Sequence, residues 1–273
     1  MSRKSLRLAA LFFILIPSVF IGDARGDDVK VLRVCADPNN LPFSNKQQEG
    51  FENRIAELTA KELGAKLSYY WWPHQRGLVR NTLRAGRCDV IIGVPKEYER
   101  VLATTPYYRT GYVLAYAKDR GLKISSLDDP VLKKLRIGVY RNTPPQQALA
   151  ERGIFGDNLV QYSRNYDWEH PEDFLLIPVK DLIAGKIDVV MIWGPDVGYC
   201  VKKISGCNLQ LVQIKEDNPH WPMSFEFSMG VKHGNKELRA QLNQVLEVRQ
   251  AEIMQVLKEY GVPIFDRVAQ KTN

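Results

Sequence analysis

The chain has 273 residues, of which 45% are hydrophobic and 25% are charged, and its formal net charge is +7. This length suits one large domain or two modest ones. The positive charge does not gather into a Lys/Arg block, which argues against nucleic-acid binding because such proteins cluster basic residues on one face.

The first 26 residues predict a secretory signal peptide. Three basic residues precede an apolar stretch at 8–21, and Ala24 and Gly26 supply small residues before a cleavage site. The alternative is an uncleaved membrane anchor, but this stretch is shorter than the roughly 20 residues that a span needs. The leader carries four basic residues and one acidic residue, so its removal lowers the net charge to +4. We therefore expect an exported protein with no membrane span after cleavage.

Apolar strands and helical patterns alternate from residue 31 to residue 213, which is typical of parallel βαβ units. Strands are predicted at 31–36, 66–72, 89–94, 112–117, 135–140, 159–162, 187–193, 209–214 and 224–232. Helices are predicted from residue 51 to Gly64, at 75–85, from Pro144, near 173–184, and as one long amphipathic helix from Leu238 to Gly261.

This order predicts an α/β fold of two lobes, with mixed, mostly parallel sheets and two hinge crossovers. Residues 27–116 plus 222–273 are expected to form lobe 1, and residues 117–221 lobe 2. The polar segment 118–121 is the expected first hinge, and 215–222 the expected return crossing. The strand-end loops should meet at one sheet edge, where open α/β sheets bind ligands. A cleft between the lobes follows.

All four cysteines follow the leader, and an even number of cysteines in an exported protein favours disulfides. Cys200 and Cys207 close a short loop and are the first expected pair. Cys35 and Cys88 then pair by elimination, provided that their strands are neighbours. The rival interpretation is a metal site, but the chain has no C-x-x-C motif and its four histidines do not stand at ligand spacing. We expect no metal and no cofactor.

Aromatic residues are frequent in and beside the strand-end loops. Such rings either line a pocket or partner site, since aromatic residues dominate interface hot spots, or pack in the core. Loop placement favours exposure for Phe43, Tyr107 and Trp193, whereas strand alternation turns about half of the rings at 69–72 inward. The aromatic candidates are Phe43, Trp72, Tyr107, Tyr108, Tyr140 and Trp193.

The polar candidates each have a simpler interpretation. Asp37 and Asn39 could bind a polar ligand, but these residues also form turns, which is favoured by a small margin. Arg76, Arg109 and Arg141 could contact an anion or an acidic partner, and each taken singly is better explained as a solvated surface arginine. The polar-aromatic segment 164–174 is equally well interpreted as a partner-specific insertion or a surface loop.

Several segments resemble type II periplasmic solute-binding proteins of ABC transporters. They are VLRVCADPNNLPF, AGRCDVIIG, TTPYYRTGYVLAY, AGKIDVVMIWGP and SMGVKHGNKELRAQLNQVL. More specifically, CADPNNLPFSN with GFENRIAELTAKELG, YYWWPHQRG and NTLRAGRCDVIIGVP resembles the MxaJ/XoxJ group. Those proteins are periplasmic binding-protein homologues associated with quinoprotein methanol dehydrogenase and its cytochrome c. The resemblance spans nearly all of the mature chain and implies the type II periplasmic binding protein fold and a periplasmic location.

The chain departs from amino-acid-binding relatives at three ligand-holding places. Glu97 stands where they carry a carboxylate-binding Arg, and Trp193 where they carry an Asp for the amine. Their Gly-Thr-Thr turn is replaced by Asn-Thr-Pro-Pro at 142–145. Thr143 is expected to be the N-cap of a helix, but the prolines lack the N–H groups that would hold an anion. Each lost charge-assisted hydrogen bond contributes roughly 1.5–3 kcal/mol, so amino-acid capture is not expected.

The first functional hypothesis is a non-catalytic periplasmic homologue that contacts a PQQ-dependent methanol dehydrogenase, with its cytochrome c as a further partner, through an aromatic cleft. The alternative is an ABC-transporter receptor for an unidentified small solute. An enzyme comes third: Glu97 or Asp196 would be its carboxylate, but nothing pairs them with a second acid or base. The expected cleft residues are Asp37, Asn39, Phe43, Trp72, Arg76, Tyr107, Tyr108, Arg109, Tyr140, Arg141, Thr143, Trp193 and Asp196.

Overall fold

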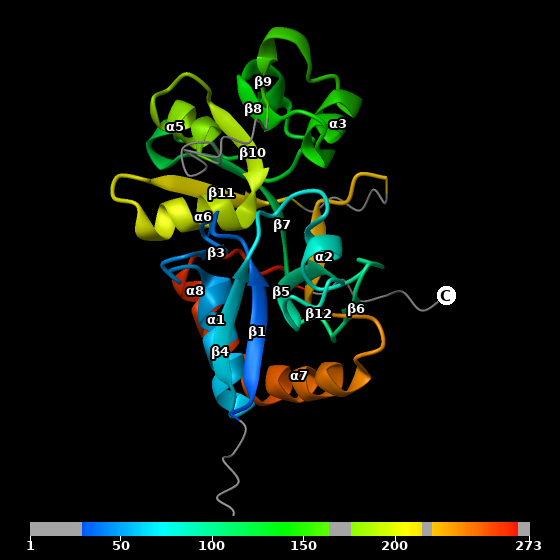
Figure 1. The fold of residues 1–273 in the computed structure, drawn as a ribbon. Helices are drawn as coiled ribbons and strands as arrows, with labels where there is room; N and C mark the ends of the chain where they lie inside the picture. Colours follow the sequence, from blue (N-terminus) through cyan, green and yellow to red (C-terminus); the bar gives the residue numbers. More distant parts are fainter. Residues whose placement is uncertain (1–28, 164–175, 215–219, 267–273) are drawn as a thin grey trace, which may run out of the picture.

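The computed structural model of the chain describes residues 29–163, 176–214 and 220–266 (Figure 1). It has an α/β fold with mixed sheets, which confirms the expected fold class. The predicted signal peptide at 1–26, the segment 164–174 and most of the return crossing at 215–222 lie outside the described residues.

The first sheet has parallel pairs at one side and antiparallel pairs at the other. β1 pairs in parallel with β4 and β5, and β12 runs antiparallel to β5, β6 and the first part of β7. Its strands are β1 (Val31–Ala36), β4 (Lys66–Trp71), β5 (Val90–Pro95), β6 (Leu102–Ala103), β7 (Tyr108–Ala117) and β12 (Ser224–Val231). Helices α1 (Phe51–Glu62), α7 (Lys236–Val248) and α8 (Gln250–Glu259) bury their apolar stripes in one core with these strands.

The second sheet continues from the other part of β7. There β7 pairs antiparallel with β10 (Val189–Trp193) and β11 (Leu209–Gln213), and β10, β8 (Ile137–Tyr140) and β9 (Leu159–Tyr162) are parallel. Helices α3 (Pro144–Glu151), α5 (Ile177–Ile183) and α6 (Gly194–Lys203) pack with them. The shorter elements are β2 (Asn39–Asn40), β3 (Ser44–Asn45), α2 (Leu78–Asn81), η1 (Lys118–Arg120), η2 (Pro130–Lys134) and η3 (Gly156–Asn158).

Strand β7 itself carries the chain from one sheet to the other. Residues 108–111 pair with β12, and residues 112–117 pair with β10 and β11. Gly111 lies at the change of partner, where a Cβ would stand 2.1 Å from the Met223 carbonyl oxygen, so only glycine allows this backbone approach. The expected hinge at 118–121 instead includes η1, and the Arg120 Nη2 contacts Asp188 at 2.5 Å. That ion pair fixes the segment to the second sheet. The division into lobes stays a prediction.

Two predicted helices differ from those in the structure. The helix expected at 75–85 is only α2, followed by turns in which Arg84 and Arg87 donate to carbonyls five residues back, which a regular α-helix does not do. The long C-terminal helix is divided at Arg249, whose guanidinium joins Glu62 on α1 to Glu252 on α8. Both α7 and α8 keep the apolar face that periodicity predicted. The predicted core residues are therefore correct, but the prediction of one unbroken helix was wrong.

Both predicted disulfides are present and buried. Cys200 and Cys207 join the end of α6 to the start of β11, with their Cα atoms 5.9 Å apart. Cys35 on β1 is bonded to Cys88, just before β5, with a Cα separation of 5.5 Å. The pairing by elimination depended on adjacent strands, and β1 and β5 are adjacent.

Candidate functional site

The loop after β1 is held by its own polar side chains. One Asp37 carboxylate oxygen accepts from the backbone N–H of Asn39 at 2.8 Å, and the other accepts from the backbone N–H of His74. The Ser44 hydroxyl bridges the N–H and the carbonyl of Asp37. These contacts are those of a turn residue, because backbone N–H groups bind both carboxylate oxygens of Asp37. Asn39 lies exposed beside it.

Glu52 lies beneath this loop, in the first turn of α1, with its carboxyl packed over Gly93 of β5. A Cβ added at Gly93 would stand 2.0 Å from Glu52 Oε1, so only glycine leaves room for the carboxyl there. Burial, reinforced by the nearby charge of Asp37, raises the pKa of Glu52 to about 8. The residue keeps some solvent-accessible surface. No donor in the described part of the chain forms a hydrogen bond with its carboxyl, so it stays uncharged at neutral pH.

Tyr107 and Tyr108 complete the wall around Glu52. Their rings lie 4.9 Å apart, and Tyr108 meets Phe51 edge-on at 6.3 Å. The Tyr107 hydroxyl donates to the Ile92 carbonyl at 3.0 Å, whereas the buried Tyr108 hydroxyl has no hydrogen-bond partner among the described residues. Burial and the neighbouring Glu52 raise the pKa of both tyrosines. The expectation of an exposed Tyr107 was wrong, because its hydroxyl finds a backbone acceptor inside the core.

A row of aromatic rings crosses from the first sheet to the second. Phe227 pairs with Tyr108, Phe225 with Thr110 and Trp193 with Tyr112 across neighbouring strands, which places these side chains on one face. Trp193 lies 5.2 Å from Tyr112 and 6.0 Å from both Phe225 and Phe227, and Phe227 stacks on Tyr108 at 5.0 Å. We call Tyr112, Trp193, Phe225 and Phe227 the aromatic row. All four are half-buried, so each retains surface for a partner.

One end of this row opens into a hollow of about 890 Å³ beside the carboxyl end of β5. Its walls come from residues 95–98, 105, 106, 109, 222 and 224–226, and Phe225 belongs to both the hollow and the row. Glu97 lines this hollow and is exposed. Arg109 lines the same hollow, but its Nη2 and Nε atoms donate to the Ser224 hydroxyl at 2.7 and 3.1 Å. Its role in the described structure is to tie β7 to β12.

The remaining candidates do not join one site. Arg76 and Arg141 are exposed, as expected of surface arginines. Thr143 is the N-cap of α3 with Pro144 at N1, as predicted, but its hydroxyl donates to the Tyr140 carbonyl at 2.7 Å. Tyr140 itself is buried against Tyr162 on β9.

The other ring candidates and Asp196 are largely packed. Phe43 is half-buried against Phe51 at 5.0 Å. Trp72 is half-buried with an indole N–H that has no hydrogen-bond partner in the described ranges. Asp196 is buried in the first turn of α6. In residues 29–163, 176–214 and 220–266, no helix is long and apolar enough to cross a bilayer, and no three His, Cys, Asp or Glu side chains gather as a metal site.

This architecture is that of a known family. Residues 32–261 match the family described as bacterial extracellular solute-binding proteins, family 3. The chain belongs to this family. It is 33% identical over 254 residues to Protein MoxJ of Methylorubrum extorquens, an alignment that covers 89% of this chain and 84% of that protein. It is 29% identical to Protein MoxJ of Paracoccus denitrificans, with 87% and 90% covered.

Two solved structures of this solute-binding family are similar over their whole length. The periplasmic binding protein XoxJ of Methylobacterium extorquens AM1 is 39% identical, with a TM-score of 0.73, and covers 87% of this chain and 100% of its own. MxaJ of Methlophaga aminisulfidivorans MPT is 30% identical, with a TM-score of 0.72, and covers 86% and 100%. The expected resemblance is thereby confirmed: the chain is a type II periplasmic binding protein close to MxaJ and XoxJ.

The sequence analysis missed two features of this family member. Glu52 looked like an ordinary acidic residue in the first turn of an amphipathic helix, where negative charge is common. Nothing in a single sequence shows that a loop folds over it. Phe225, Phe227 and Tyr112 lie in strands whose register across the crossover was not predictable. The alternation of Phe225 and Phe227 in SFEFSMGV was a usable signal.

Proposed function

We propose that this chain is a non-catalytic accessory protein of methanol oxidation that contacts a PQQ-dependent methanol dehydrogenase in the periplasm, through the aromatic row and the hollow beside it. Two things support this: the similarity to MxaJ and XoxJ along the chain, and the row itself, which supplies four half-buried rings. Aromatic side chains of this kind form the energetic centres of protein interfaces because they bury much area with little loss of side-chain entropy.

The altered clamp positions agree with a macromolecular partner. Glu97 is exposed in the hollow and would repel a ligand carboxylate. Trp193 lies at the N-terminus of α6 and contributes to the row instead of holding an amine. The cations of the hollow already have partners, because Arg109 donates to Ser224 and Lys96 pairs with Glu226. Trp193 and Phe225 add apolar area beside them. The dehydrogenase's cytochrome c is a second proposed partner.

We expect the double substitution Trp193→Ala and Phe225→Ala to weaken binding of the purified cognate dehydrogenase by at least about tenfold, since loss of hot-spot rings costs about 1.4 kcal/mol or more. The measurement is biolayer interferometry with the chain immobilised. Phe155→Ala is the matched control, because Phe155 is 68% exposed outside the row. Equal affinity of the double variant and the control, with both folded by circular dichroism, would contradict the role of the row.

A small-solute receptor is the second candidate. It is favoured by Glu52, which keeps some accessible surface and, while protonated, has a carboxyl O–H to donate to an uncharged ligand. A thermal-shift screen of neutral and aromatic solutes separates the candidates, because a solute at 100 times its dissociation constant stabilises the folded state by about 2.7 kcal/mol. A large shift with one solute, together with no association between the wild-type chain and the dehydrogenase, would replace the first proposal with the second.

A further inference from the structure

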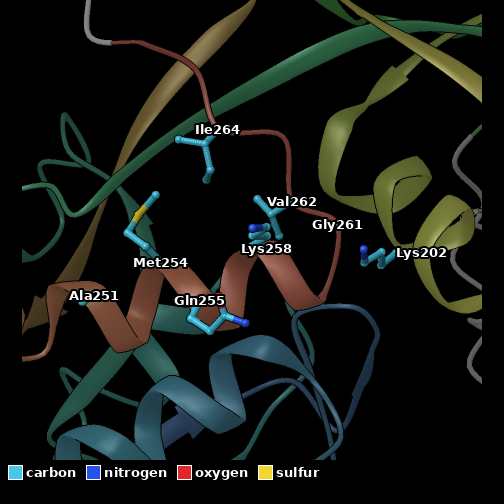
Figure 2. A pocket seen from close by; sticks show the side chains of 8 residues that line it. All are labelled: Lys202, Ala251, Met254, Gln255, Lys258, Gly261, Val262 and Ile264. Carbon is cyan, nitrogen blue, oxygen red and sulfur yellow. The ribbon is translucent and has the colours of Figure 1, made fainter.

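A second surface lies away from the aromatic row, between helix α8 and the residues that follow it. It is a groove of about 510 Å³, shown in Figure 2. One side is a stripe of α8, where positions 251, 254, 255 and 258 share a helix face. The other side is formed by residues 261–264 and by Lys202 from α6. We call this surface the basic groove. None of its residues belongs to the aromatic row or to the hollow.

The groove is built across two helices that are tightly joined. A Cβ at Gly198 of α6 would lie 2.0 Å from the Gly261 carbonyl oxygen, and a Cβ at Gly261 would lie 2.3 Å from the Gly198 carbonyl oxygen. Only glycine at both positions permits this backbone contact. Beside it, Tyr199 of α6 stacks on Tyr260 at 6.2 Å. The backbone of α6 and the backbone after α8 are therefore held together at one end of the groove before any partner binds.

The charged side chains that line the groove are the lysines Lys202 and Lys258. Lys202 and Lys258 form no ion pair with an acidic side chain in the described part of the chain. A third lysine, Lys203, lies with its Nζ 5.2 Å from the centre of the Tyr260 ring. Of the acidic residues of α8, Glu252 pairs with Arg249 at the start of the helix, and Glu259 accepts from Gln255 in the groove. Within the described residues, Lys202 and Lys258 therefore remain available to carboxylates of a binding partner.

The other end of the groove is apolar. Figure 2 shows Met254 and Ile264 at one end, Lys202 at the opposite end and Lys258 between them. Ile264 is 40% exposed, between the half-buried Pro263 and the buried Phe265, and so presents apolar surface to the groove. A ligand that fits both ends carries carboxylates next to an aliphatic or aromatic side chain, as an acidic protein segment does.

We propose that the basic groove docks an acidic segment of the methanol dehydrogenase, with carboxylates at Lys202 and Lys258 and an apolar side chain against Met254 and Ile264. This inference rests on the proposed function and adds a second contact to it. The two contacts would lie on separate faces, because the groove shares no residue with the hollow or the aromatic row.

The test compares two charge reversals of equal size. The first is Lys202→Glu with Lys258→Glu; the control is Lys66→Glu with Lys123→Glu, two exposed lysines outside the groove. Association with the purified dehydrogenase is measured at 50 and 300 mM salt. We expect the groove variant to lose about tenfold in on-rate at low salt and the control less than about twofold, with the gap narrowing at high salt because exposed charges are screened.

The outcomes are separable. If the wild-type chain does not bind the dehydrogenase, the proposed function fails and takes this inference with it. If the wild-type chain and both variants bind alike, or if both variants lose equally, the basic groove is not a specific contact and this inference alone fails. If the wild-type chain self-associates and the groove variant does not, with unchanged affinity for the dehydrogenase, the occupant is a second copy of the chain and the proposal is overturned.

Discussion

Glu52→Gln is expected to abolish a pH dependence of stability that the wild-type chain shows between about pH 4.5 and pH 8. Burial raises the pKa of Glu52 from 4.5 to about 8. In that window the native state keeps the proton and the unfolded chain releases it. The unfolded state therefore binds fewer protons, so the free energy of unfolding falls as pH rises, by about 1.4 kcal/mol for each pH unit. Glutamine cannot ionise and removes this slope.

The measurement is urea unfolding of both proteins at intervals from pH 3.5 to pH 8.5. Below pH 4.5 both states of the wild-type chain are protonated at Glu52, and the variant should match it closely. Toward pH 8 the variant should become the more stable protein, by on the order of 5 kcal/mol across the whole window. Glu57→Gln is the control on the same helix, since the Glu57 side chain is 42% exposed. Parallel profiles for the wild-type chain and Glu52→Gln would contradict the burial of this carboxyl.

Removing the Cys35–Cys88 disulfide is expected to lower the free energy of unfolding by about 4 kcal/mol, because the bond closes a long loop in the unfolded chain. Its cysteines are 53 residues apart in sequence, whereas Cys200 and Cys207 are 7 apart. The same loop-closure argument gives about 2.5 kcal/mol for the shorter loop. The longer bond also joins β1, which leads into the Asp37 loop, to the start of β5, the strand that contains Gly93.

The comparison uses paired alanine variants, Cys35→Ala with Cys88→Ala against Cys200→Ala with Cys207→Ala, unfolded in urea under identical conditions. All four cysteines are buried, so the small cavities left by the sulfur atoms affect both variants in a similar way. Reduction and alkylation of the unfolded wild-type chain before refolding gives an independent value. A larger loss for the shorter loop would overturn the assignment of the Cys35–Cys88 bond as the main covalent constraint.

Local sequence patterns predicted most of the strands and helices, but they did not predict how the two sheets are connected. The apolar runs at β1, β5 and β10 are short and rich in Val and Ile, and both disulfides followed from cysteine number and strand order. The crossover did not follow, because periodicity shows that β7 is a strand without showing that it serves two sheets. The expected hinge at 118–121 was chosen for its polarity, but Arg120 is held by Asp188, a long-range pair that no local pattern shows.

The aromatic character of the candidate site could be predicted from the sequence, but most of the residues that form it could not. The sequence indicated an aromatic site near Trp193, and the structure places Trp193 in a row of rings. Tyr107 was expected outside and is inside, because a loop residue can turn its ring into the core when an acceptor such as the Ile92 carbonyl lies there. Phe225 and Phe227 were missed because their neighbours are set by β12 pairing with β7, more than a hundred residues apart in sequence.

The path of the last described residues has a consequence for cooperativity. Val262 is buried in the core of the first sheet, and Phe265, three residues later, is buried in a core of the second. With β7 already shared between the sheets, two separate stretches of chain contribute to both cores. Neither sheet would keep a complete core if it were expressed alone. A cut at β7 takes strand partners from both sheets, and a cut before Phe265 takes this ring from the second. We expect slow amide hydrogen exchange in β7 to require global opening, so that the molecule melts as one unit.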